Sequence, residues 1–251
     1  LNKMSVISTQ LVVYVASEMP EDNTGVVGGV IDSGVRASYD DLVSSNQIII
    51  YSASGEDTSQ TLTLAGRSVG GAPISETMSL NGTTHVTSSY TYDRILKAYL
   101  DTVAVGVVTV SGNSVNNITD IPVGESGFRR PFYNATASVN EARVYYEKIF
   151  VKNNNPITFL TEAKIVEVPN TGLASKIAFG LEDTKQADQT IANRLAVPTG
   201  VTGGYGNGPS GIINDELLTE DYQGVWLQLN LDVGEVAINS FYEVQISGIT
   251  V

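Results

Sequence analysis

The sequence predicts an all-β protein made of two β-sandwich domains, of an immunoglobulin-like or jelly-roll-like kind, with only short helical turns. Three observations support this prediction. Apolar residues recur at every second position in several runs, which is the period of a half-buried strand. The strand-favouring residues Val, Ile, Thr and Tyr are plentiful, whereas Lys, Arg and Met are scarce. Gly, Pro and Asn separate the runs, as they do between strands.

The clearest strands of the first half lie between residues 60 and 110. Gln60–Leu64 and Ile74–Leu80 both alternate between apolar and polar residues. Asn81-Gly82 follows, and because both residues tolerate positive φ, the pair predicts a tight hairpin turn. Val103–Val110 is rich in β-branched residues and predicts the strand that closes this half.

Three stretches are less clear. Val35–Val43 fits a short helix or a strand, and we favour a strand for its first half because its surroundings are β. Tyr90–Asp101 carries Ile, Leu and Tyr residues at helical spacing. Lys185–Leu195 is compatible with one or two helical turns.

The boundary between the two domains is placed from composition. Ser111–Pro131 contains several Gly, Pro and Asn residues and little hydrophobic pattern, so it predicts a linker. We therefore assign residues 1–115 to an N-terminal and residues 116–251 to a C-terminal β-sandwich domain. In the second domain, Glu141–Lys152 predicts a long strand and Thr199–Gly211 a long exposed loop.

The clearest alternation in the chain is Val225–Val233, which predicts a strand that forms a C-terminal hairpin with Tyr242–Ile246. Its odd-numbered residues, such as Leu229, are predicted to face the core. Trp226 and Asn230 are predicted to face outward. A single outward tryptophan is either covered by a loop or anchors an interface, and both interpretations stay open.

Composition excludes several classes of function. Apolar residues make up 42% of the 251 residues, enough for a core, and the net charge is −13. Residues 1–110 hold 5 Lys and Arg against 11 Asp and Glu, and residues 111–251 hold 9 against 16, so neither half carries the excess. A uniformly acidic surface argues against binding to nucleic acids or anionic membranes. No apolar run reaches the roughly 18 residues of a membrane span.

Few residues are candidates for chemistry. The chain has no cysteine, and His85 is its only histidine, so a zinc site is not expected. Gly206–Gly211 matches the dinucleotide-binding pattern G-x-G-x-x-G, but it lacks the flanking strand and helix and contains Pro209. We therefore predict no catalytic, cofactor-binding or metal-binding residues, no cofactor and no enzymatic activity.

Six acidic doublets are the remaining candidates. Paired carboxylates can serve glycoside hydrolysis or calcium binding. The spacing of an EF-hand is absent, so solvated loop charge is the favoured interpretation. A calcium site within residues 215–221 and a hydrolase remain alternatives. The doublets are Glu21-Asp22, Asp40-Asp41, Glu56-Asp57, Glu182-Asp183, Asp215-Glu216 and Glu220-Asp221.

Several blocks of the chain resemble structural proteins of tailed-bacteriophage and prophage virions. These strand-and-turn blocks cover most of the chain and carry no catalytic residue. The resemblance implies a non-enzymatic virion protein, made in the host cytoplasm, that decorates or cements the outer surface of the phage head. The alternative is a tail or baseplate appendage with a host-surface or glycan-binding role. The blocks are Gly25–Ile31, Val35-Arg36 with Asp40–Leu42, Thr58–Arg67, Ile74–Thr84, Arg129–Tyr133, Tyr146–Asn153 and Gly224–Val233.

The resemblance also implies partners. The major capsid protein is the expected binding partner, together with further copies of the chain. A trimer is the expected homo-oligomer, because decoration proteins sit at local three-fold positions of icosahedral shells. No nucleic acid and no membrane is expected as a partner.

Overall fold

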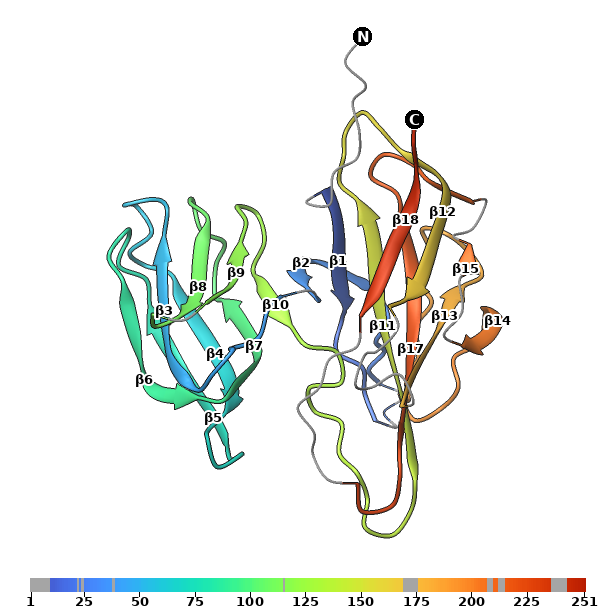
Figure 1. Cartoon of the computed structure of the whole chain (residues 1–251), viewed down its shortest axis with the longest axis horizontal. Coiled ribbons are helices and arrows are strands. Elements are labelled where there is room, and N and C mark those ends of the chain that lie inside the picture. Colours follow the sequence, from blue (N-terminus) through green and yellow to red (C-terminus); the bar gives the residue numbers. More distant parts are fainter. Residues whose placement is uncertain are drawn as a thin grey trace. The chain divides into compact units, whose positions relative to one another are not determined.

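The computed structural model describes residues 10–21, 23, 25–37, 39–114, 116–168, 176–206, 210–211, 215–235 and 243–251 (Figure 1). Strands account for 53% of the structure, and the described residues contain no helix. The sheets are antiparallel or mixed, and none closes into a barrel. The all-β prediction is therefore confirmed, whereas the predicted short helical turns do not occur in the described part of the chain.

The chain divides into two compact units. Unit 1 comprises residues 1–32 and 134–251, and unit 2 comprises residues 33–133. The boundary expected from composition, at residues 115/116, falls inside unit 2 between two strands that pair with each other, β8 (Val108–Gly112) and β9 (Asn117–Ile121). Ser111–Pro131 looks like a linker because β9 is a short edge strand, and such a strand needs few apolar residues.

Unit 2 contains two hydrogen-bonded arrays of strands. The order in the first is β5-β4-β7-β10, and β10 also pairs in parallel with β2. The order in the second is β6-β3-β8-β9. The remaining bounds are β2 (Ile31–Arg36), β3 (Asn46–Ser52), β4 (Thr61–Arg67), β5 (Pro73–Ser79), β6 (Val86–Tyr92), β7 (Arg94–Leu100) and β10 (Gly127–Arg129).

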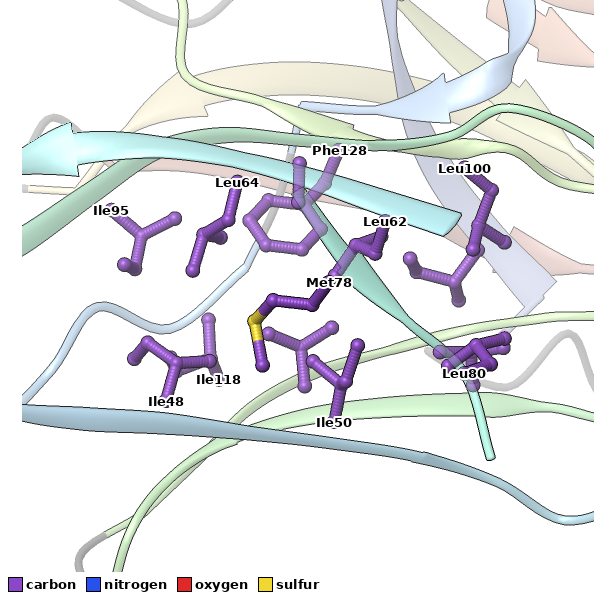
Figure 2. Close-up of a cluster of buried hydrophobic side chains, with 14 of the residues drawn as sticks. Ile48, Ile50, Leu62, Leu64, Met78, Leu80, Ile95, Leu100, Ile118 and Phe128 are labelled. Carbon is purple, nitrogen blue, oxygen red and sulfur yellow. The ribbon is translucent and has the colours of Figure 1, made fainter. Parts of the chain in front are cut away.

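The core of unit 2 is shared by the two arrays. Figure 2 shows Leu62 and Leu64 of β4 in one cluster with Ile48 and Ile50 of β3, and these four side chains are fully buried. Met78 of β5 is buried in the same cluster. The alternation predicted for Gln60–Leu64 and Ile74–Leu80 is thus confirmed, because the apolar positions of both runs face this core.

The stretch with helical spacing, Tyr90–Asp101, is extended and forms the end of β6 and the whole of β7. A bulge explains the misleading pattern. Ala65 pairs with Lys97 but Gly66 pairs with Ile95, so one residue of β7 is unpaired and the alternation shifts by one. Ile95 and Ala98, three positions apart, are therefore both buried. The helical turns suggested for Lys185–Leu195 are absent as well.

Unit 1 is built around a long strand pair. The strand order is β14-β13-β17-β11-β1, and β12 pairs with β15, β16 and β18 (Figure 1). The bounds are β1 (Leu11–Ala16), β11 (Arg143–Asn153), β12 (Leu160–Glu167), β13 (Ile177–Glu182), β14 (Val201–Gly206), β15 (Ser210–Gly211), β16 (Glu216–Leu217), β17 (Tyr222–Leu231) and β18 (Val244–Thr250). The long strand predicted at Glu141–Lys152 is confirmed as β11.

Two predictions for unit 1 are wrong. The C-terminal hairpin does not form, because β17 already pairs with β11 and β13 along its two edges, so β18 pairs with β12 instead. Tyr242 lies outside the described residues. The stretch Thr199–Gly211 is not one long loop, since β14 occupies its first half and pairs with β13. Glycine-rich strands show little side-chain alternation, which is why the pattern missed it.

Candidate interaction surface

One end of unit 2 brings several connections together, and we call it the loop end. Residues 53–60, 80–85, 101–107 and 122–126 join the strands there. Backbone hydrogen bonds connect them: Ser52 N donates to Gly82 O at 2.9 Å, and Ala53 N donates to Val107 O at 2.8 Å. The Asn81-Gly82 turn is tight, as predicted, with Gly82 at φ 57°. It joins strands of different arrays, however, and so is not a hairpin.

Asp57 organises the loop end from within. Its carboxylate is fully buried and accepts hydrogen bonds from the backbone N–H groups of Val105 (2.8 Å) and Gly106 (2.9 Å). It also accepts hydrogen bonds from Ser52 Oγ (2.5 Å) and Gln60 Nε2 (3.1 Å). The backbone carbonyl of Asp57 accepts a hydrogen bond from Gly82 N. One residue thus connects three of the four segments.

The electrostatics of Asp57 follow from these contacts. Burial acts to raise the pKa of the carboxyl group, but the hydrogen bonds from Ser52, Val105 and Gly106 outweigh it, so the pKa lies below its ordinary value of 3.8. Asp57 is therefore ionised at neutral pH, and hydrogen bonds from uncharged donors stabilise its charge. It serves to hold the loops, and its burial keeps it from contact with a substrate.

Valine side chains cover the outside of the loop end. Val103, Val105, Val107 and Val123 are 54%, 58%, 36% and 58% exposed, and we call them the valine rim. The prediction that Val103–Val110 forms a strand is wrong for its first five residues, since β8 begins at Val108. The cause is Asp57, which draws the N–H groups of Val105 and Gly106 inward. A Cβ at Gly106 would overlap Ser54 N, so this close approach requires glycine.

His85 lies at the same end. Its ring is exposed and stacks on Tyr51, with ring centroids 4.4 Å apart. The stacked pair lies beside the Asn81-Gly82 turn and adds an aromatic surface to the loop end.

The acidic doublets share one arrangement that the favoured interpretation described only in part. In four of them, one carboxylate is exposed and its neighbour is buried or paired. Solvated charge thus describes only the exposed members, which are Asp40, Glu56, Asp183 and Glu220. The described residues contain no cluster of three or more His, Asp or Glu that would suit a metal ion. The paired members are Asp41 with Arg130, Asp57 with the loop end, Glu182 with Lys148, and Asp221 with Lys185.

Trp226 is fully buried, although its strand register was predicted correctly for Val225, Leu227 and Leu229. It packs in a cluster of unit 1 with Tyr14, Tyr146 and Phe150. Other side chains cover both faces of β17 at this point. The face that was predicted to be exposed therefore packs in a second hydrophobic core. Trp226 therefore offers no exposed anchor for an interface.

The described part of the chain contains no helix with the length and apolar character needed to cross a bilayer.

A comparison with protein-family models, curated proteins and solved structures finds no match for this chain. The loop end must accordingly be interpreted from its own chemistry. The loop end was not predicted from the sequence, because alternating valines indicate a strand when the residues that contact them are unknown. The signal that pointed to it is the single Gly106 within that run, which marks a close backbone approach.

Proposed function

We propose that this protein is a non-enzymatic structural component of a phage virion that decorates the outer surface of the head. The loop end of unit 2 would be the surface that binds the major capsid protein. In this proposal both units are β-sandwiches of the immunoglobulin-like or jelly-roll-like kind. The shared core of the two arrays in unit 2 supports that assignment for unit 2, and the sequence resemblance supports the virion role.

The observation that carries the proposal is the valine rim. The valine rim places four exposed apolar side chains on connections at a single end, and exposed apolar patches mark interaction sites. Fully burying one valine side chain contributes about 1.5–3 kcal/mol, so four partly exposed ones supply a modest contact. Many copies on a symmetric shell convert modest contacts into firm attachment.

Charge indicates which partner surface fits. The four segments of the loop end contain no Lys or Arg. Two acidic residues, Glu56 and Asp101, are exposed there, whereas Asp57 is buried and Glu125 is paired with Arg36. A complementary coat surface would be apolar at its centre and basic at its rim. Unit 2 is the less charged unit, with 6 Lys and Arg against 9 Asp and Glu in residues 33–133. The acidic excess lies mainly in unit 1, where like charges would keep neighbouring copies apart.

Binding to capsids tests the proposal. The phage whose genome carries this chain would be grown without it, and purified protein would be added back to the heads and sedimented with them. Val105→Asp places a charge in the valine rim and should weaken binding at least about tenfold, or 1.4 kcal/mol. Val69→Asp is the matched control, because Val69 is 68% exposed on the turn between β4 and β5, at the opposite end of β4 from the loop end. Equal binding of the two variants, or no binding of the unaltered protein, would contradict the proposal.

Self-association belongs to the same proposal. We expect a trimer, either in solution or on the particle, whose formation strengthens with salt because salt screens the repulsion between copies of charge −13. Sedimentation velocity at low and high salt measures this. A monomer at both salt concentrations, with no contact between copies in images of the particle, would exclude it.

The alternative role, a tail or baseplate appendage that binds host surfaces or glycans, is favoured by one observation. The exposed His85 ring stacks on the half-buried Tyr51 ring, and the pair forms an aromatic surface of the kind on which a sugar ring can lie. Gold-labelled antibody against the protein distinguishes the two roles in electron micrographs. Label on the head supports decoration, and label confined to the tail supports the appendage.

A further inference from the structure

Unit 1 contains a buried ion pair that the proposed function does not use. Lys148 of β11 and Glu182 of β13 are both fully buried, and Lys148 Nζ lies 2.7 Å from Glu182 Oε1. Their two strands flank β17, so the side chains meet across it. They do so at Gly224, where a Cβ would overlap both Glu182 Oε2 and Lys148 Cε. The absence of a side chain at Gly224 therefore creates the space in which the pair meets.

The surroundings of the pair are two aromatic rings, the backbone of Gln189 and a further carboxylate, Asp188, whose charge acts on both groups. Lys148 Nζ lies 4.6 Å from the ring centroid of Phe150 and 5.2 Å from that of Trp226. Gln189 contacts both partners: its N–H donates to Glu182 Oε1 at 2.9 Å, and its carbonyl accepts from Lys148 Nζ at 3.2 Å. Glu182 Oε2 is buried without a hydrogen-bond partner among the described residues.

Such an environment disfavours charge on both groups. Burial lowers the pKa of Lys148 and raises the pKa of Glu182, although the hydrogen bond between them opposes both shifts. A proton transferred from Lys148 to Glu182 leaves a neutral amine beside a neutral carboxylic acid. These are the reactive forms for amide formation, because the amine then has a free electron pair and the acid can release a hydroxyl group.

We propose that Lys148 and Glu182 condense into an amide that covalently cross-links β11 to β13. The Lys148 nitrogen attacks the carboxyl carbon of Glu182, and the new C–N bond replaces the bond to one carboxyl oxygen, assigned here to the unpartnered Oε2. That oxygen leaves as water with two protons, one from the acid and one from the amine. No oxidant, metal or cofactor is needed. The Gln189 N–H, which already donates to Oε1, stabilises the negative charge that develops on that oxygen.

Two physical effects favour the reaction. Groups held in contact react as if at effective concentrations of up to about 10⁵–10⁸ M, which compensates for the reluctance of acids and amines to condense in water. The product is also neutral, so it removes the cost of keeping two charges away from water. The pair would then tie together three adjacent strands, because the bond spans β17.

Mass spectrometry of the full-length protein tests the proposal directly. The denatured chain should be lighter than its sequence mass by one water molecule. Trypsin should fail to cut after Lys148, so peptide Val144–Lys152 should remain joined to peptide Ile177–Lys185 as one branched species. A mass equal to that of the sequence, or separate peptides ending at Lys148 and Lys185, would overturn the proposal.

Two variants test whether Lys148 is the source of the mass deficit of one water molecule. Lys148→Met removes the nucleophile and should restore the full sequence mass. Lys185→Met removes a different lysine of a close ion pair, which lies 2.8 Å from Asp221, and should leave the deficit unchanged. If the deficit persisted in Lys148→Met, its source would lie elsewhere and the proposal would be wrong. The measurement on the unaltered chain decides the question even if Lys148→Met does not fold.

Discussion

At the scale of single residues, four acidic doublets divide their charges between the surface and the interior. In each of them, one carboxylate is exposed and its neighbour is buried or paired. The interior member then requires donors. Asp57 takes its donors from the loop end and Asp41 takes Arg130, at 2.5 Å. Neighbouring residues of the same type thus have different roles, one in solubility and one in loop structure.

Asp57→Asn should destabilise unit 2 by about 1.5–3 kcal/mol at neutral pH, because an amide replaces a charged acceptor of several hydrogen bonds. The pKa of Asp57 is lowered on folding, so its carboxylate contributes stability above the unfolded value of 3.8. That contribution is lost as pH falls through the lower pKa of the folded state. Urea unfolding at several pH values should therefore show that the difference in unfolding free energy between the unaltered protein and Asp57→Asn becomes smaller in acid.

Glu56→Gln is the control for this measurement, since Glu56 is exposed beside Asp57. Its stability should stay within about 0.5 kcal/mol of the unaltered protein. If the loss of unfolding free energy in Asp57→Asn became larger in acid, the lowered pKa of Asp57 would be contradicted.

At the scale of elements, β17 is the central strand of unit 1. Its two edges pair with β11 and β13, and its first half is buried on both faces. A strand in this position has no free edge for a further hairpin, which is why β18 pairs elsewhere. Substitutions in its core-facing positions should therefore affect the whole unit.

Leu229→Asp should prevent unit 1 from folding, or destabilise it by more than about 3 kcal/mol, because it buries a carboxylate without a partner. Leu229 is 8% exposed. Asn230→Asp, one position along and exposed, should change stability by less than about 0.5 kcal/mol. Thermal unfolding followed by circular dichroism compares them, and equal midpoints would mean that the strand register is different.

At the scale of the whole molecule, the chain enters unit 1, forms unit 2, and returns to unit 1. β1 precedes unit 2 in the sequence but pairs with β11, which follows it. Unit 2 is consequently continuous, whereas unit 1 requires two separated segments of chain. This arrangement also divides the charge unevenly, since residues 33–133 carry only 9 of the 27 acidic residues.

Residues 33–133 should fold alone, because both arrays and their shared core come from this segment. Residues 1–115, the domain expected from composition, should not. That fragment lacks β9 and β10, which cover part of the core, and it carries β1 without β11. Cooperative thermal unfolding of the first fragment but not of the second is the expected result. The reverse outcome would show that the boundary at residue 115 is the real one.

The sequence by itself determined the fold class and the core-facing residues of the regular strands. Leu62, Leu64, Met78, Val225, Leu227 and Leu229 are buried as predicted. Val233, which was predicted to face the core as well, lies beyond the end of β17 and is 55% exposed. Alternation is a local property of a pleated strand, so it can be recognised without knowing what the strand packs against.

Only the tertiary structure decided which strands pair, where the units begin, and what the exceptions mean. The bulge in β7 gave the apolar residues a spacing like that of a helix, because one extra residue shifts the alternation by one position. The segment that carries most of the valine rim has the residue pattern of a strand but does not form one. Two of its N–H groups donate to Asp57, some 48 residues away in the sequence, and not to a neighbouring strand. Trp226 appeared outward because a single strand does not reveal that both of its faces are covered. In each case the deciding contact joins residues far apart in the chain, and a local pattern carries no record of such contacts.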